Sequence, residues 1–157
     1  VNWGYEVGSH TITHLNLKKA SAEEATKQLA KSQQTLEDLI GGGYSVSTIS
    51  IPFGEYPEDI SILTGGEYDG MQYSYSAALA LGSLPSASPF STDFDPMRIP
   101  RIRGSESYLT DAIAHFKSHP ELRYVSDGDP TTVSAPAELS SELGDLRDDL
   151  GRPIITY

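Results

Sequence analysis

Apolar and polar positions alternate along this chain with helical and extended periods in turn. The clearest helical pattern runs over residues 21 to 41, where apolar residues recur at three- and four-residue spacing. Ser21 and Glu24 fit a capping box at its start, and the glycine run at 41 to 43 ends it. Similar spacing predicts helices over residues 107 to 119 and 137 to 150.

Between these helices the pattern is that of short strands. Residues 44 to 51 mix Val46, Ile49 and Ile51 with serine and threonine, which predicts a strand that ends at Pro52. A short helix over 57 to 63 and a strand over 72 to 81 follow, and residues 151 to 157 read as a short buried strand. Strands alternating with helices predict an α/β fold with a parallel sheet.

Three tyrosines near the second predicted strand allow two interpretations. Tyr68, Tyr73 and Tyr75 can line a ligand groove, or they can be half-buried structural residues, since tyrosine suits a pleated and partly buried surface. The pattern leaves both interpretations open.

Length and charge narrow the range of functions. A chain of 157 residues predicts one domain over residues 1–157. The formal charge of −11 argues against binding to nucleic acid or to an anionic membrane, because phosphates would be repelled. The absence of cysteine excludes disulfides and thiolate metal ligands, and no apolar run approaches the roughly 20 residues that span a bilayer.

His10 and His14 are the candidate metal ligands, because imidazole is a favoured ligand of zinc and its neighbours. The three residues between them are β-branched, which disfavours a helix, and Gly8 precedes them. Thr11 also stands where the helical His-Glu-x-x-His motif has its glutamate. We therefore predict an extended segment leading into a loop. On spacing alone, two unrelated surface histidines are an equal alternative.

The surrounding residues carry a resemblance. The run Gly-Tyr-Glu-Val-Gly-Ser-His-Thr-Ile-Thr-His from Gly4 to His14, continuing to Leu17, resembles the metal-binding motif of the polysaccharide deacetylases, the NodB-homology domains of carbohydrate esterase family 4. Ile-Pro-Phe-Gly-Glu-Tyr at 51 to 56 resembles the family's groove segment, and Asp-Pro-Met-Arg-Ile-Pro-Arg-Ile at 95 to 102 resembles a segment near its end. The resemblance implies a deformed (β/α) barrel, here incomplete at its N-terminus.

The resemblance also implies roles for individual residues. His10 and His14 correspond to ligands of a divalent metal, with zinc first among the compatible ions. Arg101 corresponds to a residue that orients a carboxylate or binds an anion, although an ion pair with Asp95 is an equal alternative. The residues matching the substrate groove are Pro52, Phe53, Gly54 and Tyr56.

The chain also departs from the family. Members carry an Asp-Asp pair, the general base and third metal ligand, on a strand before the two histidines, but only nine residues precede His10. The adjacent Asp148 and Asp149 lie in a predicted helix, which favours a solvated face. The segment 151 to 157 resembles either the family's last strand or the run that leads into the Asp-Asp pair.

The candidates for the catalytic acid are the two remaining histidines, His115 and His119. The family carries its acid in a Leu-x-His strand, whereas both of these lie in a predicted helix, so exposed helix histidines are the alternative. Neither residue is identified as catalytic by its sequence context.

Two functions follow from the resemblance. One is a metal-dependent hydrolase that removes acetyl groups from a polysaccharide, an N-acetylglucosamine-containing or other envelope glycan. The other is a catalytically impaired carbohydrate-binding module in a cell-surface or virion assembly. Both imply a carbohydrate polymer as partner and an extracellular or cell-envelope location. An incomplete barrel would also need a partner chain or a missing segment to cover its strand edges.

Overall fold

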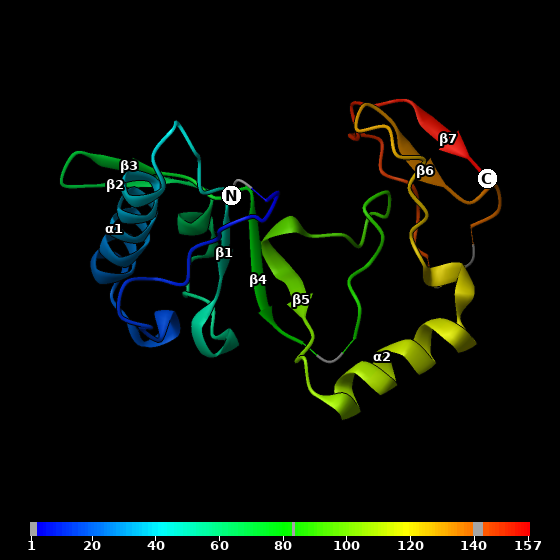
Figure 1. The fold of residues 1–157 in the computed structure, drawn as a ribbon, viewed down its shortest axis with the longest axis horizontal. Helices are drawn as coiled ribbons and strands as arrows, with labels where there is room; N and C mark the ends of the chain where they lie inside the picture. Colours follow the sequence, from blue (N-terminus) through cyan, green and yellow to red (C-terminus); the bar gives the residue numbers. More distant parts are fainter. Residues whose placement is uncertain (1–2, 83, 140–142) are drawn as a thin grey trace. The chain divides into compact units, whose positions relative to one another are not determined.

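The computed structural model describes residues 3–82, 84–139 and 143–157. The chain divides into two compact units, Val1–Gly82 with Pro96–Arg101, and Ser83–Asp95 with Ile102–Tyr157 (Figure 1). Each unit has its own buried cluster of apolar side chains. Since two compact units can belong to one domain, the single domain predicted from length stays a prediction.

The main helix of the first unit is α1 (Ala22–Ile40), preceded by the 3-10 turn η1 (Leu17–Lys19). The Ser21 hydroxyl accepts a hydrogen bond of 3.2 Å from the Glu24 N–H, which is the cap that the sequence predicts. Gly41, with φ of +67°, ends the helix in a conformation that a glycine adopts without steric cost. The helix predicted over residues 21 to 41 is confirmed.

The first unit contains a parallel sheet in the order β1 (Thr48–Ser50), β4 (Ala77–Leu81) and β5 (Ile99–Arg101). Ser9 forms a parallel bridge with Ile49, bonding the Thr48 carbonyl and the Ser50 N–H at 2.8 and 2.9 Å. Successive backbone groups of a strand point to opposite edges, so Ser9 lies on the edge of β1 that β4 does not use. The sequence segment with His10 is thereby attached to the sheet.

The strand predicted over residues 72 to 81 is wrong, because the chain turns within it. Residues Met71–Tyr73 form β3, which pairs antiparallel with β2 (Gly66–Tyr68), and β4 begins only at Ala77. The side chain of Gln33 from α1 bonds both backbone groups of Ser74, at 3.0 Å to the N–H and 2.9 Å to the carbonyl. These bonds replace the ladder bonds that a continuous strand would make.

Two further predictions of this region hold in part. The strand predicted over residues 44 to 51 is confirmed only for Thr48–Ser50. The short helix predicted over 57 to 63 is a single 3-10 turn, η3 (Ile60–Leu63), whose start is capped by Asp59. A second 3-10 turn, η2 (Pro52–Gly54), lies between them, and η4 (Pro96–Arg98) leads into β5.

The core of the first unit lies between one face of the sheet and α1 (Figure 1). Ile49 of β1 and Ala78 and Ala80 of β4 are buried with Ala25 and Leu29 of α1. Side chains alternate along each strand, so the intervening residues face the other way. That second face carries the candidate site.

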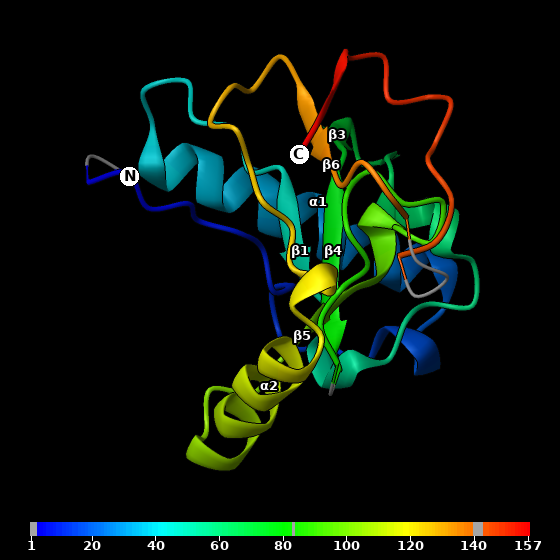
Figure 2. The same cartoon turned by 90° about the vertical axis from the view of Figure 1, so that its right-hand side faces the viewer.

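The second unit contains α2 (Glu106–Ser118), the turn η5 (Pro120–Leu122), and a parallel pair of strands, β6 (Val133–Ala135) and β7 (Ile154–Thr156). The helix α2 and the strand pair lie at opposite ends of this unit (Figures 1 and 2). The helix predicted over residues 107 to 119 is confirmed. The buried cluster of the second unit consists of Phe90, Val133, Ala135 and Leu143.

The helix predicted over residues 137 to 150 is wrong for the described part, since residues 137–139 and 143–150 contain no helix and 140–142 lie outside the described residues. Gly144 has φ of +71°, and a Cβ there would lie 2.5 Å from the Ser91 hydroxyl. Leu146 instead forms an antiparallel bridge with Ser91. The leucine spacing therefore reflects packing of an extended segment against the Phe90 cluster.

The predicted C-terminal strand exists, but the prediction that it is buried is wrong. Ile154 and Ile155 of β7 are 38% and 46% exposed. The strand β7 forms its ladder hydrogen bonds with β6. The prediction failed because an apolar run can form a strand whether or not other side chains cover its two faces.

The α/β fold class is confirmed, whereas a barrel is not seen. Among the described residues the strands form one three-stranded and two two-stranded sheets, none of which closes. The deformed barrel remains an implication of the resemblance. None of the described helices is both long and apolar enough to cross a membrane.

Candidate functional site

His10 is held at the edge of the sheet with a defined ring orientation. Its Nδ1 lies 2.6 Å from the Ser50 carbonyl oxygen. A carbonyl only accepts hydrogen bonds, so the proton of a neutral ring is on Nδ1 and the lone pair is on Nε2. Metal-binding histidines in proteins are commonly oriented by such a second hydrogen bond.

The structure brings His14 next to His10. Their ring centroids are 4.8 Å apart and the rings meet edge to face at 75°. At this separation two imidazole nitrogens can share one cation, since zinc–nitrogen bonds are about 2.0–2.1 Å long. Their role as ligands stays a prediction, but the alternative of two unrelated histidines does not describe this geometry.

The segment between the histidines is a loop and not a helix, as predicted, but it bends at Ile12 and Thr13 instead of staying extended. Thr11 and His14 have φ of +63° and +56°, the left-handed region that residues with a Cβ seldom adopt. The Gln28 side chain of α1 accepts hydrogen bonds from the Ile12 and Thr13 N–H groups at 2.9 and 3.0 Å. The turn is therefore pinned to the helix behind it.

Phe53, a residue of the groove motif, contacts His14. Its ring centroid lies 4.5 Å from that of His14, and the side chain is 55% exposed. Its φ of +60° is again left-handed. Backbone strain of this kind clusters at functional sites, where surrounding structure holds it. Pro52 beside it is buried and serves packing.

Tyr56, the last residue of the groove motif, lies against a cation. The Arg98 guanidinium carbon is 5.4 Å from the centroid of the Tyr56 ring. The ring is partly buried against the core of the first unit. Stacking on a sugar, the predicted role of Tyr56, stays a prediction.

Arg101 and His10 line one hollow of about 510 Å³ on the open face of the sheet. Glu6 lies at the same hollow and accepts a hydrogen bond of 2.6 Å from the Thr48 hydroxyl. The Arg101 Nε is buried and has no hydrogen-bond partner among the described residues. An anionic group entering the hollow could satisfy it. The remaining lining comes from Gly8, Ser9, Ser50, Ala77, Leu79 and Ile99.

The two imidazoles fit a divalent cation as part of its ligand set. Catalytic zinc sites use three protein ligands and keep one position open. Within the described ranges no group of three histidine, aspartate or glutamate side chains gathers at one point. His10 and His14 therefore supply two ligands, and the family's third ligand corresponds to no residue placed beside them.

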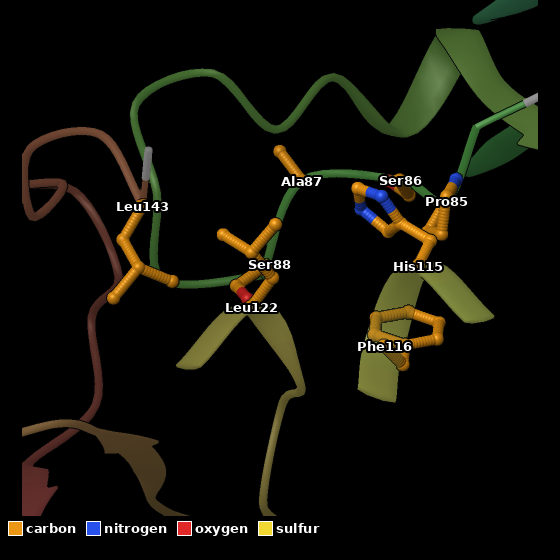
Figure 3. A pocket seen from close by; sticks show the side chains of 8 residues that line it. All are labelled: Pro85, Ser86, Ala87, Ser88, His115, Phe116, Leu122 and Leu143. Atoms are coloured by element: carbon orange, nitrogen blue, oxygen red, sulfur yellow. The ribbon is translucent and has the colours of Figure 1, made fainter. Parts of the chain in front are cut away.

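His115, the candidate acid, belongs to the second unit and lies on α2. With Phe116, Leu122 and Leu143 it lines a separate hollow of about 220 Å³ against the segment at 85 to 88 (Figure 3). Its ring centroid is 5.2 Å from that of His119, which also pairs with Glu121. His115 is not among the residues that line the His10 hollow, and its catalytic role stays a prediction.

The open question about the tyrosines is answered for two of them. Tyr73 and Tyr75 are buried, and their hydroxyls donate to the carbonyls of Ile62 and Leu29 at 2.7 and 2.9 Å. Burial raises the pKa of Tyr75 to about 12. Both are structural residues, and the groove interpretation is wrong for them.

The adjacent aspartates are not in a helix, contrary to the prediction. Asp149 pairs with Arg147 at 2.8 Å and is exposed, and this partner lowers the pKa of the Asp149 carboxyl. The pair thus fits a solvated surface, as the sequence interpretation had it.

Two contributors to the site were missed by the sequence reasoning, the Gln28 amide and the Ser50 carbonyl. Gln28 lies among apolar residues on the inner face of α1, and a glutamine on a core-facing stripe is a signal that it has a buried partner. The Ser50 contact has no such signal, because it depends on the register between residue 9 and β1.

Comparison with known proteins identifies the first part of the chain. Residues 1–73 match the family model of polysaccharide deacetylases. A peptidoglycan-N-acetylglucosamine deacetylase of Bacillus cereus is 36% identical over 58 residues, which cover 37% of this chain and 20% of that protein. The chain thus matches about a fifth of that relative's length. No solved structure matches the chain.

Proposed function

Residues 1–73 carry the sequence of a polysaccharide deacetylase domain, and from this premise we propose that the protein is a metal-dependent hydrolase that removes acetyl groups from a polysaccharide. The substrate class is an N-acetylglucosamine-containing or other envelope glycan. The observation that carries the proposal is the His10–His14 pair, with ring centroids 4.8 Å apart and the His10 Nδ1 bonded to the Ser50 carbonyl, which leaves the lone pair on Nε2.

His10 and His14 would hold the cation, for which zinc is the proposed ion because it favours imidazole. Bound there, a divalent cation would polarise the acetyl carbonyl and lower the pKa of a water molecule. The chain's own contribution is orientation. The Ser50 carbonyl keeps the His10 proton on Nδ1, and the Gln28 amide holds the turn that carries His14.

Substrate binding is assigned to the open side of the same region. Phe53 presents an exposed aromatic ring beside His14, and such a ring can stack on a sugar. The buried Arg101 Nε is proposed to orient a carboxylate at the hollow it shares with His10. Pro52 and Gly54 support this wall through the turn they form.

The proposed location is extracellular or in the cell envelope, where the proposed glycan is found. The partner is the carbohydrate polymer itself. Within the described part of the chain β5 is a terminal strand of the three-stranded sheet, which supports the further proposal that a partner chain or another segment covers its outer edge.

The test measures bound metal and acetate release from chitin oligosaccharides in the wild type and in the His10→Ala and His14→Ala variants. We expect both substitutions to remove the metal, because each takes away an imidazole ligand. His119→Ala, at an exposed histidine of the second unit, is the matched control for metal content. Unchanged metal content in the His10→Ala variant would refute the assignment.

A second candidate is carbohydrate binding without hydrolysis, favoured by the exposed ring of Phe53. Binding of chitin oligosaccharides that depends on Phe53, with no acetate released in the presence of zinc, would support this alternative over the hydrolase.

A further inference from the structure

The turn that carries His14 depends on an external support. Thr11 and His14 both occupy the left-handed region, and neither is a glycine. Such a conformation persists only when neighbouring groups hold it. A relaxed turn would move His14 relative to His10, because His10 is fixed separately at the sheet by the Ser50 carbonyl.

Gln28 of α1 makes most of the side-chain contacts to this turn, beside a longer bond of 3.4 Å from the Thr11 N–H to the Ser9 hydroxyl. The Gln28 Oε1 accepts from two consecutive N–H groups, those of Ile12 and Thr13, at 2.9 and 3.0 Å. The Gln28 Nε2 donates to the Thr13 hydroxyl at 2.9 Å. Both ends of one amide therefore bind the same turn.

Gln28 is itself held in place. It is 6% exposed on the inner face of α1, and its Nε2 also donates to Glu24 Oε1 at 3.2 Å. This hydrogen bond is the main cause that lowers the pKa of Glu24, so its carboxylate stays an acceptor. Lys27 pairs with the same carboxylate at 3.2 Å. The amide cannot flip without losing bonds at both of its ends.

We propose that Gln28 is the positioning residue of the candidate metal centre, holding the His10–His14 turn in the conformation that presents both imidazoles to one cation. It touches neither the metal nor the substrate. The inference rests on the proposed metal site. It adds that the site also needs a side chain of α1, a helix outside the two-histidine motif.

The chain offers a matched control in Gln33. It is also 6% exposed on α1, and its amide also bonds backbone groups, but these belong to Val46, which precedes β1, and to Ser74, which lies between β3 and β4. Gln28→Leu and Gln33→Leu therefore remove equally buried amides from one helix. Only the first of these amides contacts the histidine turn.

The experiment titrates each purified full chain with Co²⁺, followed by its visible absorption, and measures hydrogen exchange of the Ile12 and Thr13 amides without metal. For Gln28→Leu we expect about 10- to 100-fold weaker Co²⁺ binding, the range found when supporting groups of metal ligands are removed. We also expect both amides to lose protection. Gln33→Leu should lower the melting temperature and leave Co²⁺ affinity and these two amides unchanged.

The double variant Gln28→Glu/Glu24→Gln exchanges donor and acceptor between the two side chains, because Gln28→Glu alone would set two carboxylates against each other. The carboxylate at position 28 still accepts from both N–H groups, so this variant should bind Co²⁺ as the wild type does, and it decides the matter if Gln28→Leu does not fold. Wild-type affinity in Gln28→Leu, equal weakening in Gln33→Leu, or weak binding in the folded double variant would overturn the inference. A wild type that does not bind Co²⁺ would overturn the proposed function instead, and amide exchange would still decide whether Gln28 holds the turn.

Discussion

Gly54 provides a sharp test of the packing beside the candidate site. It ends the Pro52–Gly54 turn with φ of +71°. An added Cβ would lie 3.1 Å from the Leu81 Cβ and 3.2 Å from the Leu81 backbone nitrogen of β4. Gly42 is the matched control, with φ of +62° and no atom within 4 Å of an added Cβ.

Comparing the two glycines separates the cost of a left-handed backbone from the cost of crowding against Leu81. A left-handed residue with a Cβ costs about 1–2 kcal/mol, which is the whole expectation for Gly42→Ala. Gly54→Ala adds the crowding against Leu81, for which overpacking costs of about 1–3 kcal/mol are typical. We therefore expect Gly54→Ala to reduce the free energy of unfolding by about 2–5 kcal/mol. The displaced turn would also move Phe53 away from His14.

The assay is urea denaturation of both variants, with Co²⁺ titration of the folded proteins. Gly54→Ala should show the lower denaturation midpoint and weaker Co²⁺ binding, whereas Gly42→Ala should retain wild-type binding. Equal losses of stability in the two variants would show that Leu81 does not crowd this position, and the reasoning would then be wrong.

Three further predictions concern the fold and the groove. Tyr75→Phe should cost about 1 kcal/mol at pH 7 through the lost bond to Leu29. Burial raises the pKa of the folded-state tyrosine from 10.0 to about 12, so its stabilisation is complete below pH 10 and is lost as pH rises through 12. This loss, on the order of 2–3 kcal/mol once pH has passed 12, should make the variant the more stable protein there, as urea titrations across pH will test. Ser21→Ala should lower the unfolding free energy by about 1 kcal/mol, since it removes the N-cap of α1; an unchanged midpoint would contradict the cap. Phe53→Ala should leave the melting temperature unchanged, because the ring is largely exposed, and should weaken chitin-oligosaccharide binding by about 0.5–1.5 kcal/mol; equal binding by calorimetry would remove Phe53 from the groove.

Local features of the chain were predictable from its residues. The helix α1 follows from a cap, an apolar stripe and a terminal glycine, all of which act within a few residues. The absence of a helix at Thr11 to Thr13 follows from the three β-branched residues in the same way, whereas the left-handed conformation of Thr11 does not. The two-histidine motif carried the resemblance to the polysaccharide deacetylases, whose family model matches residues 1–73, because its residues are close together in the sequence.

The errors share a different origin. Residues 137 to 150 have leucines at helical spacing, yet the positive φ of Gly144 and the bridge from Leu146 to Ser91 prevent a helix. The strand over 72 to 81 is interrupted because Gln33, distant in sequence, binds the Ser74 backbone. The spacing of apolar residues indicates which side chains share a face of an element, but it does not indicate which distant residues pack against that face.

The sequence by itself thus determined the α/β class, the main helices and the candidate ligands, because these depend on short-range spacing and on the chemistry of single side chains. Only the tertiary structure decided that Ser50 orients His10, that Gln28 holds the turn before His14, and that Tyr75 is buried. These contacts join residues 16 to 46 positions apart, so they exist only once residue 9 pairs with β1 and α1 packs on the sheet.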